Sequence, residues 1–252
     1  PISLSTACAS GATAIQLGNS NNPHDLRCFP PTADKPSHPL VQRSLIVMTA
    51  GPSVLRNQRG LVDSHDVVVR VNNYKIGLAQ GFRCDVFYSF FGRSIKKTHA
   101  DLRGVKLCMC KCPNAQFIES EWHRAHNKMV GVDFRRIYAH RAGWWFCPTY
   151  VPPVEDFLCT FNMLGRHVPT TGFSAIVDVL SYAPRKIFLT GFDFFRSGVH
   201  NLNERWRPGD ESDPIGHVPE REAEWLRERM RTYPFECDDT LSSILGNRAH
   251  AV

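Results

Sequence analysis

A glycine turn between a predicted strand and a predicted helix is the first place in this chain where chemistry could occur. The strand is expected over residues 44–49, and Gly51, Pro52 and Ser53 follow at the start of the helix. Glycine lets the backbone approach a phosphate, and the first N–H groups of a helix can donate hydrogen bonds to it. The turn alone also fits a purely structural connection, which is common in α/β proteins.

A second polar cluster precedes another predicted helix later in the chain. Thr170, Thr171 and Gly172 stand directly before an apolar helical segment. Hydroxyl and N–H groups at a helix start suit a carboxylate or a phosphate. Capping of the helix by a threonine explains the same residues, so both interpretations stay open.

The elements that must position these residues follow an alternating β/α pattern. Short β-branched runs separated by amphipathic segments predict a mainly parallel sheet flanked by helices, and 252 residues fit one such domain. We expect strands over residues 44–49, 67–71, 85–89, 105–110, 136–139 and 186–190. We expect helices over residues 53–61, 95–102, 115–128, 173–182, 219–231 and 238–245.

The first 40 residues differ in composition from the rest. They are rich in Ser, Asn, Pro and Ala, which predicts an arm or linker before a globular domain over residues 41–252. Residues 6–11 (TACASG) are also similar to the nucleophile turn of β-ketoacyl synthases. That family needs a longer chain and an HGTGT motif, which this sequence lacks, so the arm is the preferred interpretation.

Composition argues against several classes of partner. The formal net charge is +6 without a long basic run, so we expect no nucleic-acid partner. No apolar stretch approaches the roughly 20 residues that cross a bilayer, and residues 1–18 lack the pattern of a signal peptide.

The chain has nine cysteines, among them Cys108, Cys110 and Cys112. Their alternation places all three on one face of a predicted strand, where we expect buried free thiols.

Two longer patterns together resemble the sialyl motifs of the sialyltransferases. Residues 62–72 (VDSHDVVVRVN) are similar to the second half of the long motif, IDSHD followed by a strand and R-x-N, and the spacing back to the glycine turn agrees. Residues 167–172 (HVPTTG), an apolar helix and residues 187–192 (IFLTGF) are similar to the short motif. Residues 63–66 are expected to serve as scaffold.

Two histidines extend the resemblance. His217 and Glu222 have the H-x4-E spacing of the motif that supplies the family's catalytic base, and His200 stands where the small third motif has a histidine. The resemblance covers about residues 44–229. It implies a single Rossmann-like nucleotide-binding domain, the GT-A-like variant of the sialyltransferases.

The resemblance also implies an activity. It is inverting, metal-independent transfer of an acidic ulosonic sugar from a CMP-activated donor to a hydroxyl of a glycan or glycolipid acceptor, without a cofactor. His217 is then the general base and His200 stabilises the departing phosphate. CMP-sialic acid and CMP-Kdo both remain open as donors. A noncatalytic CMP-sugar or nucleotide-binding module is the alternative, against which the two histidines argue.

The residues implied to contact the donor come from four segments. The first turn and Asn72 are implied to bind the phosphate and ribose. The second polar cluster is implied to bind the sugar carboxylate or phosphate, and the end of the last motif strand to line the cytidine pocket. The full set is Thr49, Gly51, Pro52, Ser53, Asn72, Thr170, Thr171, Gly172, Gly191, Phe192 and Asp193. Trp144, Trp145 and Trp206 could stack on a sugar or belong to the core.

The chain departs from the family pattern at named positions. Thr49 and Pro52 stand where the family usually has asparagines, so part of the phosphate contact must differ. The cysteine pair that staples vertebrate members is missing, because Ser44 precedes the first strand and residues 181–185 contain no cysteine. This favours a cytoplasmic, bacterial-type relative, with peripheral attachment to an inner membrane also compatible, over a truncated Golgi enzyme.

Overall fold

A computed structural model of the chain describes residues 40–91, 95–98, 100–111, 149–150, 152, 154–197, 199–200, 204–205, 217–233 and 235–246. The predicted arm, apart from Leu40, lies outside these residues. So do the predicted strand at 136–139, the predicted helix at 115–128, Cys112 and the three tryptophans considered for sugar stacking.

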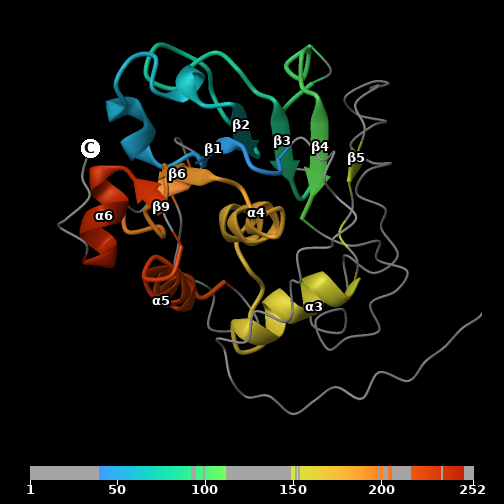
Figure 1. Ribbon diagram of the computed structural model, residues 1–252, viewed down its shortest axis with the longest axis vertical. Helices are drawn as coiled ribbons and strands as arrows, with labels where there is room; N and C mark the ends of the chain where they lie inside the picture. Colours follow the sequence, from blue (N-terminus) through green and yellow to red (C-terminus); the bar gives the residue numbers. More distant parts are fainter. Residues whose placement is uncertain are drawn as a thin grey trace, which may run out of the picture.

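The described residues form one parallel sheet (Figure 1). Its strands are β1 (Ser44–Met48), β2 (Val67–Val71), β3 (Val86–Ser89), β4 (Leu107–Cys110), β5 (Thr149–Tyr150), β6 (Lys186–Thr190) and β9 (Phe235–Cys237). They lie in the order β5-β4-β3-β2-β1-β6-β9, and every neighbouring pair is parallel. The predicted α/β class with a parallel sheet is confirmed, and β1, β2, β3, β4 and β6 lie within predicted strands.

The strand order reverses at β1. From there the chain builds outward through β2, β3 and β4 on one side, and it later returns to place β6 against the other side of β1. In open parallel sheets, ligands bind at the carboxyl ends of the strands where the order reverses. The fold therefore directs attention to the loops that follow β1 and β6.

Helices cover both faces of the sheet. They are η2 (Pro52–Arg56), η3 (Val62–Ser64), α3 (Val154–Met163), α4 (Thr171–Leu180), α5 (Pro219–Arg229) and α6 (Asp239–Leu245), with a two-stranded ribbon of β7 (Val199–His200) and β8 (Glu204–Arg205). Side chains of α4, α5 and α6 pack on one face against alternate strand residues such as Leu45 and Val47. Val54 of η2 and Val62 of η3 pack on the other face against Ile46 and Met48.

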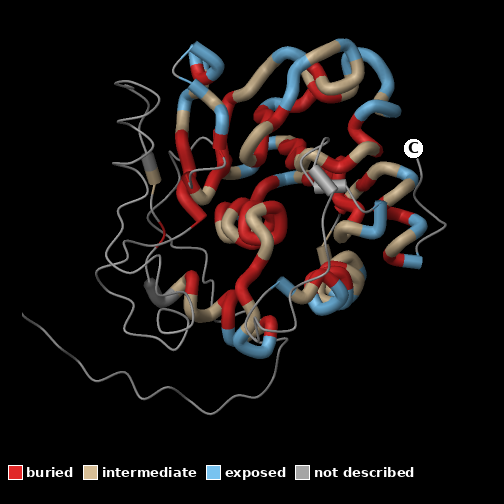
Figure 2. Tube along the Cα trace, turned by 180° about the vertical axis from the view of Figure 1, so that it is seen from behind, coloured by how far each residue is buried: buried red, intermediate tan, exposed pale blue. Residues whose placement is uncertain are grey.

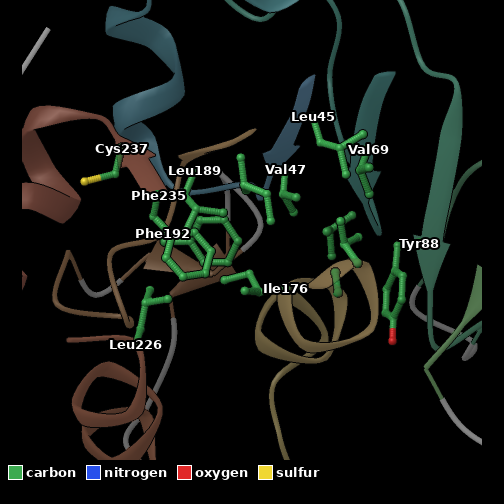
Figure 3. Packing of buried hydrophobic residues seen from close by; sticks show 14 of the residues in the cluster. Leu45, Val47, Val69, Tyr88, Ile176, Leu189, Phe192, Leu226, Phe235 and Cys237 are labelled. Carbon is green, nitrogen blue, oxygen red and sulfur yellow. The ribbon is translucent and has the colours of Figure 1, made fainter. Parts of the chain in front are cut away.

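The helix α4 is the central helix on the face of the sheet that α4, α5 and α6 cover (Figures 1 and 2). Seven of its ten residues are buried, and Figure 2 shows the buried colour along most of it. Close to β1 and β3, Ile176 packs among Val47, Leu189 and Phe192 (Figure 3). A helix buried on this scale holds its first turn at a fixed place relative to the strand ends.

Residues 63–66 of the long sialyl-like motif serve as scaffold, as expected, and Arg70 has a similar role. The Asp63 carboxylate accepts from the N–H groups of Phe82 and Arg83, each at 3.2 Å, and Asp66 accepts from the N–H of Ser44 at 2.9 Å. The Arg70 side chain is buried and donates to the carbonyl oxygens of residues 75, 80 and 83. These bonds fix the loop between β2 and β3.

Some sequence predictions of local structure were wrong or incomplete. The predicted helix at 53–61 is the short 3-10 helix η2, and residues 95–98 and 100–102 form no helix. There the Asp101 carboxylate accepts from both the N–H and the hydroxyl of Thr98, and these local bonds compete with a helical turn. The strands β5 and β9 and the helix α3 were not predicted; the two strands are only two and three residues long.

The cysteine prediction is confirmed within the described residues. Cys108 and Cys110 are buried free thiols in the same apolar cluster, so they share one face of β4. Cys237 on β9 is also free and buried, and burial raises the pKa of its thiol to about 12. A thiol with so high a pKa is unreactive at neutral pH.

Candidate functional site

The loops that follow β1 and β6 contact one another directly through their backbones. The N–H of Thr49 donates to Thr190 O at 3.1 Å, and the N–H of Gly51 donates to Gly191 O at 3.1 Å. The hydroxyl of Thr49 also donates to Gly191 O. Gly51 was predicted to offer its N–H to a phosphate, but in this structure that N–H is already engaged.

Three glycines make this approach possible. A Cβ on Gly51 would lie 2.2 Å from Gly191 O, and a Cβ on Gly172 would lie 2.7 Å from Cγ2 of Thr49. Gly191 has a φ of +81°, a conformation that favours glycine. We call Thr49, Gly51, Gly172 and Gly191 the glycine contact; all four were predicted as site residues.

Asn72 lies at the carboxyl end of β2, the neighbour of β1. Its φ is +51°, and its N–H donates to Tyr88 O at 3.0 Å. The hydroxyl of Ser89 donates to Asn72 Oδ1 at 3.1 Å and accepts from the N–H of Phe91 at 3.1 Å. These hydrogen bonds orient the Asn72 amide, so that its Nδ2 is the group that can donate to a ligand.

The start of α4 resolves one of the open alternatives. Thr170 is the N-cap of α4, because its hydroxyl accepts from the N–H of Phe173 at 3.1 Å. The hydroxyl donates in turn to the Glu222 carboxylate at 2.7 Å, and the N–H of Thr170 donates to the same carboxylate. Thr170 therefore serves as a cap, and Thr171 is the first residue of the helix.

Glu222 is a fully buried carboxylate. It is 1% exposed, and burial raises its pKa to about 7 even though the two bonds from Thr170 act in the opposite direction. The sequence placed Glu222 only in the H-x4-E spacing. The structure adds its task, which is to attach the start of α5 to the start of α4.

His217 lies at the surface just before α5. Its Nδ1 is 2.6 Å from Val168 O. A carbonyl oxygen can only accept, so Nδ1 carries the proton, and Nε2 is the proton-accepting nitrogen of the neutral ring. We call Val168, Thr170, His217 and Glu222 the histidine dock. The arrangement gives an exposed imidazole in the tautomer that a general base needs.

The remaining predicted residues have different surroundings. Phe192 is 6% exposed and packs in the main core, with Leu189 and Leu226 in the same cluster (Figure 3). The Asp193 carboxylate accepts from the N–H groups of Phe195 and Ser197 at 3.1 and 3.3 Å, so it holds its own turn. Phe192 was predicted to line the cytidine pocket and Asp193 to contact the donor, and packing and turn formation account for the contacts they make.

Three more predicted residues complete the set. Pro52 opens η2, and the hydroxyl of the adjacent Ser53 donates to Asp238 at 2.7 Å. The backbone of His200 lies in β7 opposite Glu204, and its side chain is outside the described part of the chain.

Sequence reasoning missed two residues at this edge, Asp238 and Ser89. Asp238 was predicted only as the first residue of the last helix, and nothing in the sequence pairs it with Ser53. Ser89 ends a predicted strand, and nothing in its sequence context pairs it with Asn72.

The described residues lack a metal-binding group and a membrane-spanning helix. They contain no group of three or more His, Cys, Asp or Glu side chains placed to hold a metal ion. Within the same part of the chain, no helix is both long and apolar enough to cross a membrane.

No protein-family model and no curated protein sequence matches the chain. Solved structures do match. The sialyltransferase CstII from Campylobacter jejuni in complex with cytidine-5'-monophosphate has a TM-score of 0.50 at 16% identity, over 78% of this chain and 80% of that chain. CST-II in complex with a trisaccharide acceptor and CMP also has a TM-score of 0.50 at 16% identity, over 82% and 85%.

The chain has the sialyltransferase fold. A mammalian sialyltransferase is less similar, with a TM-score of 0.48 and 14% identity over 77% of this chain and 68% of that chain. On the sialyltransferase fold of this chain, the glycine contact joins the loops after β1 and β6 to the start of α4. The histidine dock joins the start of α4 to the start of α5.

Proposed function

We propose that this protein is a glycosyltransferase that takes an acidic ulosonic sugar from a CMP-activated donor and transfers it to a hydroxyl of a glycan or glycolipid. The observation that carries the proposal is the meeting of distant motif segments at one end of the sheet. Gly51 contacts Gly191, Gly172 contacts Thr49, and His217 is hydrogen-bonded to the backbone just before α4. Residues 41–252 would form the catalytic domain, with the preceding residues as an arm.

Solved structures with this fold support the choice of donor. CstII has been seen with CMP, and CST-II with CMP and a trisaccharide acceptor together. A cytidine donor in this chain would lie over the carboxyl ends of β1, β2 and β6, where parallel sheets bind nucleotides. Asn72 Nδ2 and the first turn of α4 would then donate to its phosphate or carboxylate.

The transfer step follows from the tautomer of His217. Nε2 takes the proton of the acceptor hydroxyl as that oxygen attacks the anomeric carbon. The bond from this carbon to the phosphate oxygen breaks, and CMP leaves with the electron pair. Attack opposite to the leaving group inverts the anomeric centre. Val168 O stabilises the imidazolium that forms, because it accepts from Nδ1 throughout.

The leaving phosphate needs a partner as charge develops on it. His200 is proposed for this role, as a proton or hydrogen-bond donor. The proposed reaction needs no metal, since an imidazole base and hydrogen-bond donors can supply the required stabilisation. The sugar is sialic acid or Kdo, which share the carboxylate next to the anomeric carbon.

The experiment that tests the proposal is CMP release from CMP-Neu5Ac and CMP-Kdo in parallel, with and without EDTA. Release from one donor, unchanged by EDTA, is the expected result and identifies the sugar. Release that depends on Mg²⁺ or Mn²⁺ would indicate another class of transferase. CMP binding without release from either donor would favour a noncatalytic nucleotide-binding module instead.

A further inference from the structure

A partly buried polar cluster supports the glycine contact through a residue that lies outside every sialyl-like motif. Its centre is Asp238, which lies between β9 and α6 in the C-terminal part of the chain. The N–H of Asp238 donates to Leu189 O at 3.1 Å, so its backbone continues the sheet beside the end of β6. The sequence separates Asp238 from Ser53 by 185 positions.

The two oxygens of the Asp238 carboxylate have different partners. Oδ1 accepts from the N–H of Leu241 at 2.9 Å and caps α6. Oδ2 accepts from the hydroxyl of Ser53 at 2.7 Å and from the N–H of Gly191 at 2.9 Å, which Ser53 Oγ shares at 3.2 Å. The hydroxyl of Thr190 lies 2.9 Å from Oδ2 and 3.1 Å from Asn57 Oδ1. One oxygen thus maintains a helix, and the other gathers donors from the loops after both β1 and β6.

Donors face both oxygens of this side chain, so the position requires a carboxylate, which accepts at both. An ionised carboxylate oxygen only accepts, whereas an amide nitrogen at the same place would only donate. Bonds of this kind to a charged acceptor are stronger than bonds between neutral groups. The Oδ2 cluster therefore holds Gly191 in position, and Gly191 O in turn receives the N–H of Gly51 and the hydroxyl of Thr49.

The surrounding structure does not depend on Oδ2 alone. Arg56 of η2 donates to the hydroxyl of Thr240 in α6, and Arg227 of α5 donates to Leu245 O at 3.2 Å. These bonds attach α6 to its neighbours without Asp238. Loss of the Oδ2 cluster should therefore loosen the two loops and leave the helices packed.

We propose that Asp238 is a positioning residue for the donor, whose carboxylate locks the loops after β1 and β6 into the geometry that binds the CMP phosphate. The proposal rests on the proposed function, because it assigns CMP to these loops. It names a residue that acts through Ser53 and Gly191 and does not itself touch the nucleotide.

The decisive variant is Asp238→Asn. Asparagine caps helices as well as aspartate does, so Oδ1 can still hold α6, while the amide nitrogen faces the donors of Ser53 and Gly191 and cannot accept from them. Asp239→Asn is the matched control, because it removes the same charge from an exposed neighbour in the first turn of α6. Calorimetry with CMP and thermal unfolding are measured on the full chain.

We expect Asp238→Asn to weaken CMP binding at least tenfold and to raise KM for the donor more than it lowers kcat. Asp239→Asn should stay within twofold of the parent in both. Hydrogen exchange of the Gly191 N–H in ligand-free protein should accelerate at least tenfold in Asp238→Asn only. Unchanged CMP affinity together with unchanged exchange overturns the proposal.

Two further outcomes are also decisive. If the parent does not bind CMP, the proposed function fails, and the exchange of Gly191 still decides whether Asp238 locks the loops. If Asp238→Asn does not fold, Ser53→Ala replaces it, since this variant removes one donor from Oδ2 and leaves the cap on α6. Ser53→Ala should then weaken CMP binding about threefold or more, and parent-like affinity overturns the proposal.

Discussion

The glycine contact and the histidine dock lie at the same end of the sheet but are built differently. In the glycine contact, Gly51 meets the backbone of Gly191 and Gly172 meets the side chain of Thr49, so neither glycine has space for a side chain. In the histidine dock, a buried carboxylate and a carbonyl oxygen orient side chains, and the imidazole of His217 stays at the surface. Substitutions in the glycine contact should therefore alter folding and CMP binding together. A substitution in the histidine dock can instead remove the proposed catalytic base without altering either.

The strongest test of the glycine contact is Gly51→Ala. The new Cβ would lie 2.2 Å from Gly191 O, a backbone atom that cannot swing away. We expect a loss of about 3 kcal/mol or more in unfolding free energy, together with loss of CMP binding. Denaturant unfolding and calorimetry measure the two effects.

The control for this variant is Gly60→Ala. Gly60 has a φ of +84° but nothing within 4 Å of its Cβ position, so only backbone strain of about 1–2 kcal/mol is expected there. CMP binding should survive in Gly60→Ala. Equal effects of the two variants on stability and binding would show that the glycine contact is not as tight as the geometry indicates.

For the histidine dock, His217→Ala should separate chemistry from binding. A positioned base contributes a factor of roughly 10² to 10⁴, so turnover should fall by that amount while the Kd for CMP hardly changes. Steady-state transfer and calorimetry measure the two quantities. Glu220→Ala, an exposed change in the first turn of the same helix, is the control and should transfer normally.

Near-normal transfer by a folded His217→Ala would remove this residue from the mechanism. His200→Ala is expected to differ from it by weakening binding of the CMP-sugar as well as slowing transfer, because its proposed partner is the phosphate.

Glu222 should make the unfolding free energy of the protein depend on pH. Burial raises its pKa from 4.5 to about 7, so the folded protein retains a proton that the unfolded chain releases between these values. The contribution of Glu222 to stability is therefore present below about pH 4.5 and is lost as the pH rises to about 7. Glu222→Gln should remove this slope, which thermal unfolding across that range would detect.

The comparison variant at this position is Glu222→Ala. It leaves the N–H and hydroxyl of Thr170 without their acceptor, at a cost of about 1–3 kcal/mol. Glu222→Gln keeps a group that can bond to Thr170, and transfer should stay within a few-fold of the parent. Equal stability of the Gln and Ala variants would contradict the role assigned to this carboxylate.

The smallest expected effect is that of Ser89→Ala, which removes the hydroxyl that orients Asn72. One hydrogen bond is worth about 1 kcal/mol, so CMP affinity should fall about fivefold with kcat unchanged. Ser243→Ala, at an exposed position of α6, is the control. An affinity equal to that of the parent would show that Asn72 keeps its orientation without Ser89, or does not contact the donor.

Much of the fold could be predicted because it depends on local patterns. The β-branched runs that became β1, β2 and β6 are buried on both faces, which makes them continuous apolar segments in the sequence. Short edge strands such as β5 and β9 have too few residues for a hydrophobic pattern to be recognised in the sequence. Residues 95–102 had helical periodicity, but bonds between Thr98 and Asp101 formed other turns.

The sequence by itself determined the candidate site residues Gly51, Asn72, Gly172, Gly191 and His217, because motifs of fixed order and spacing mark them. Only the tertiary structure decided what these residues do there. It engaged the N–H of Gly51 with Gly191, buried Glu222 against Thr170 and set the tautomer of His217 through Val168 O. It also brought Asp238 to Ser53 across 185 positions. Hydrogen bonds of this kind join segments that are distant in the chain, so no local pattern contains them; they are set by the order of strands in the sheet and by the helices that pack on it.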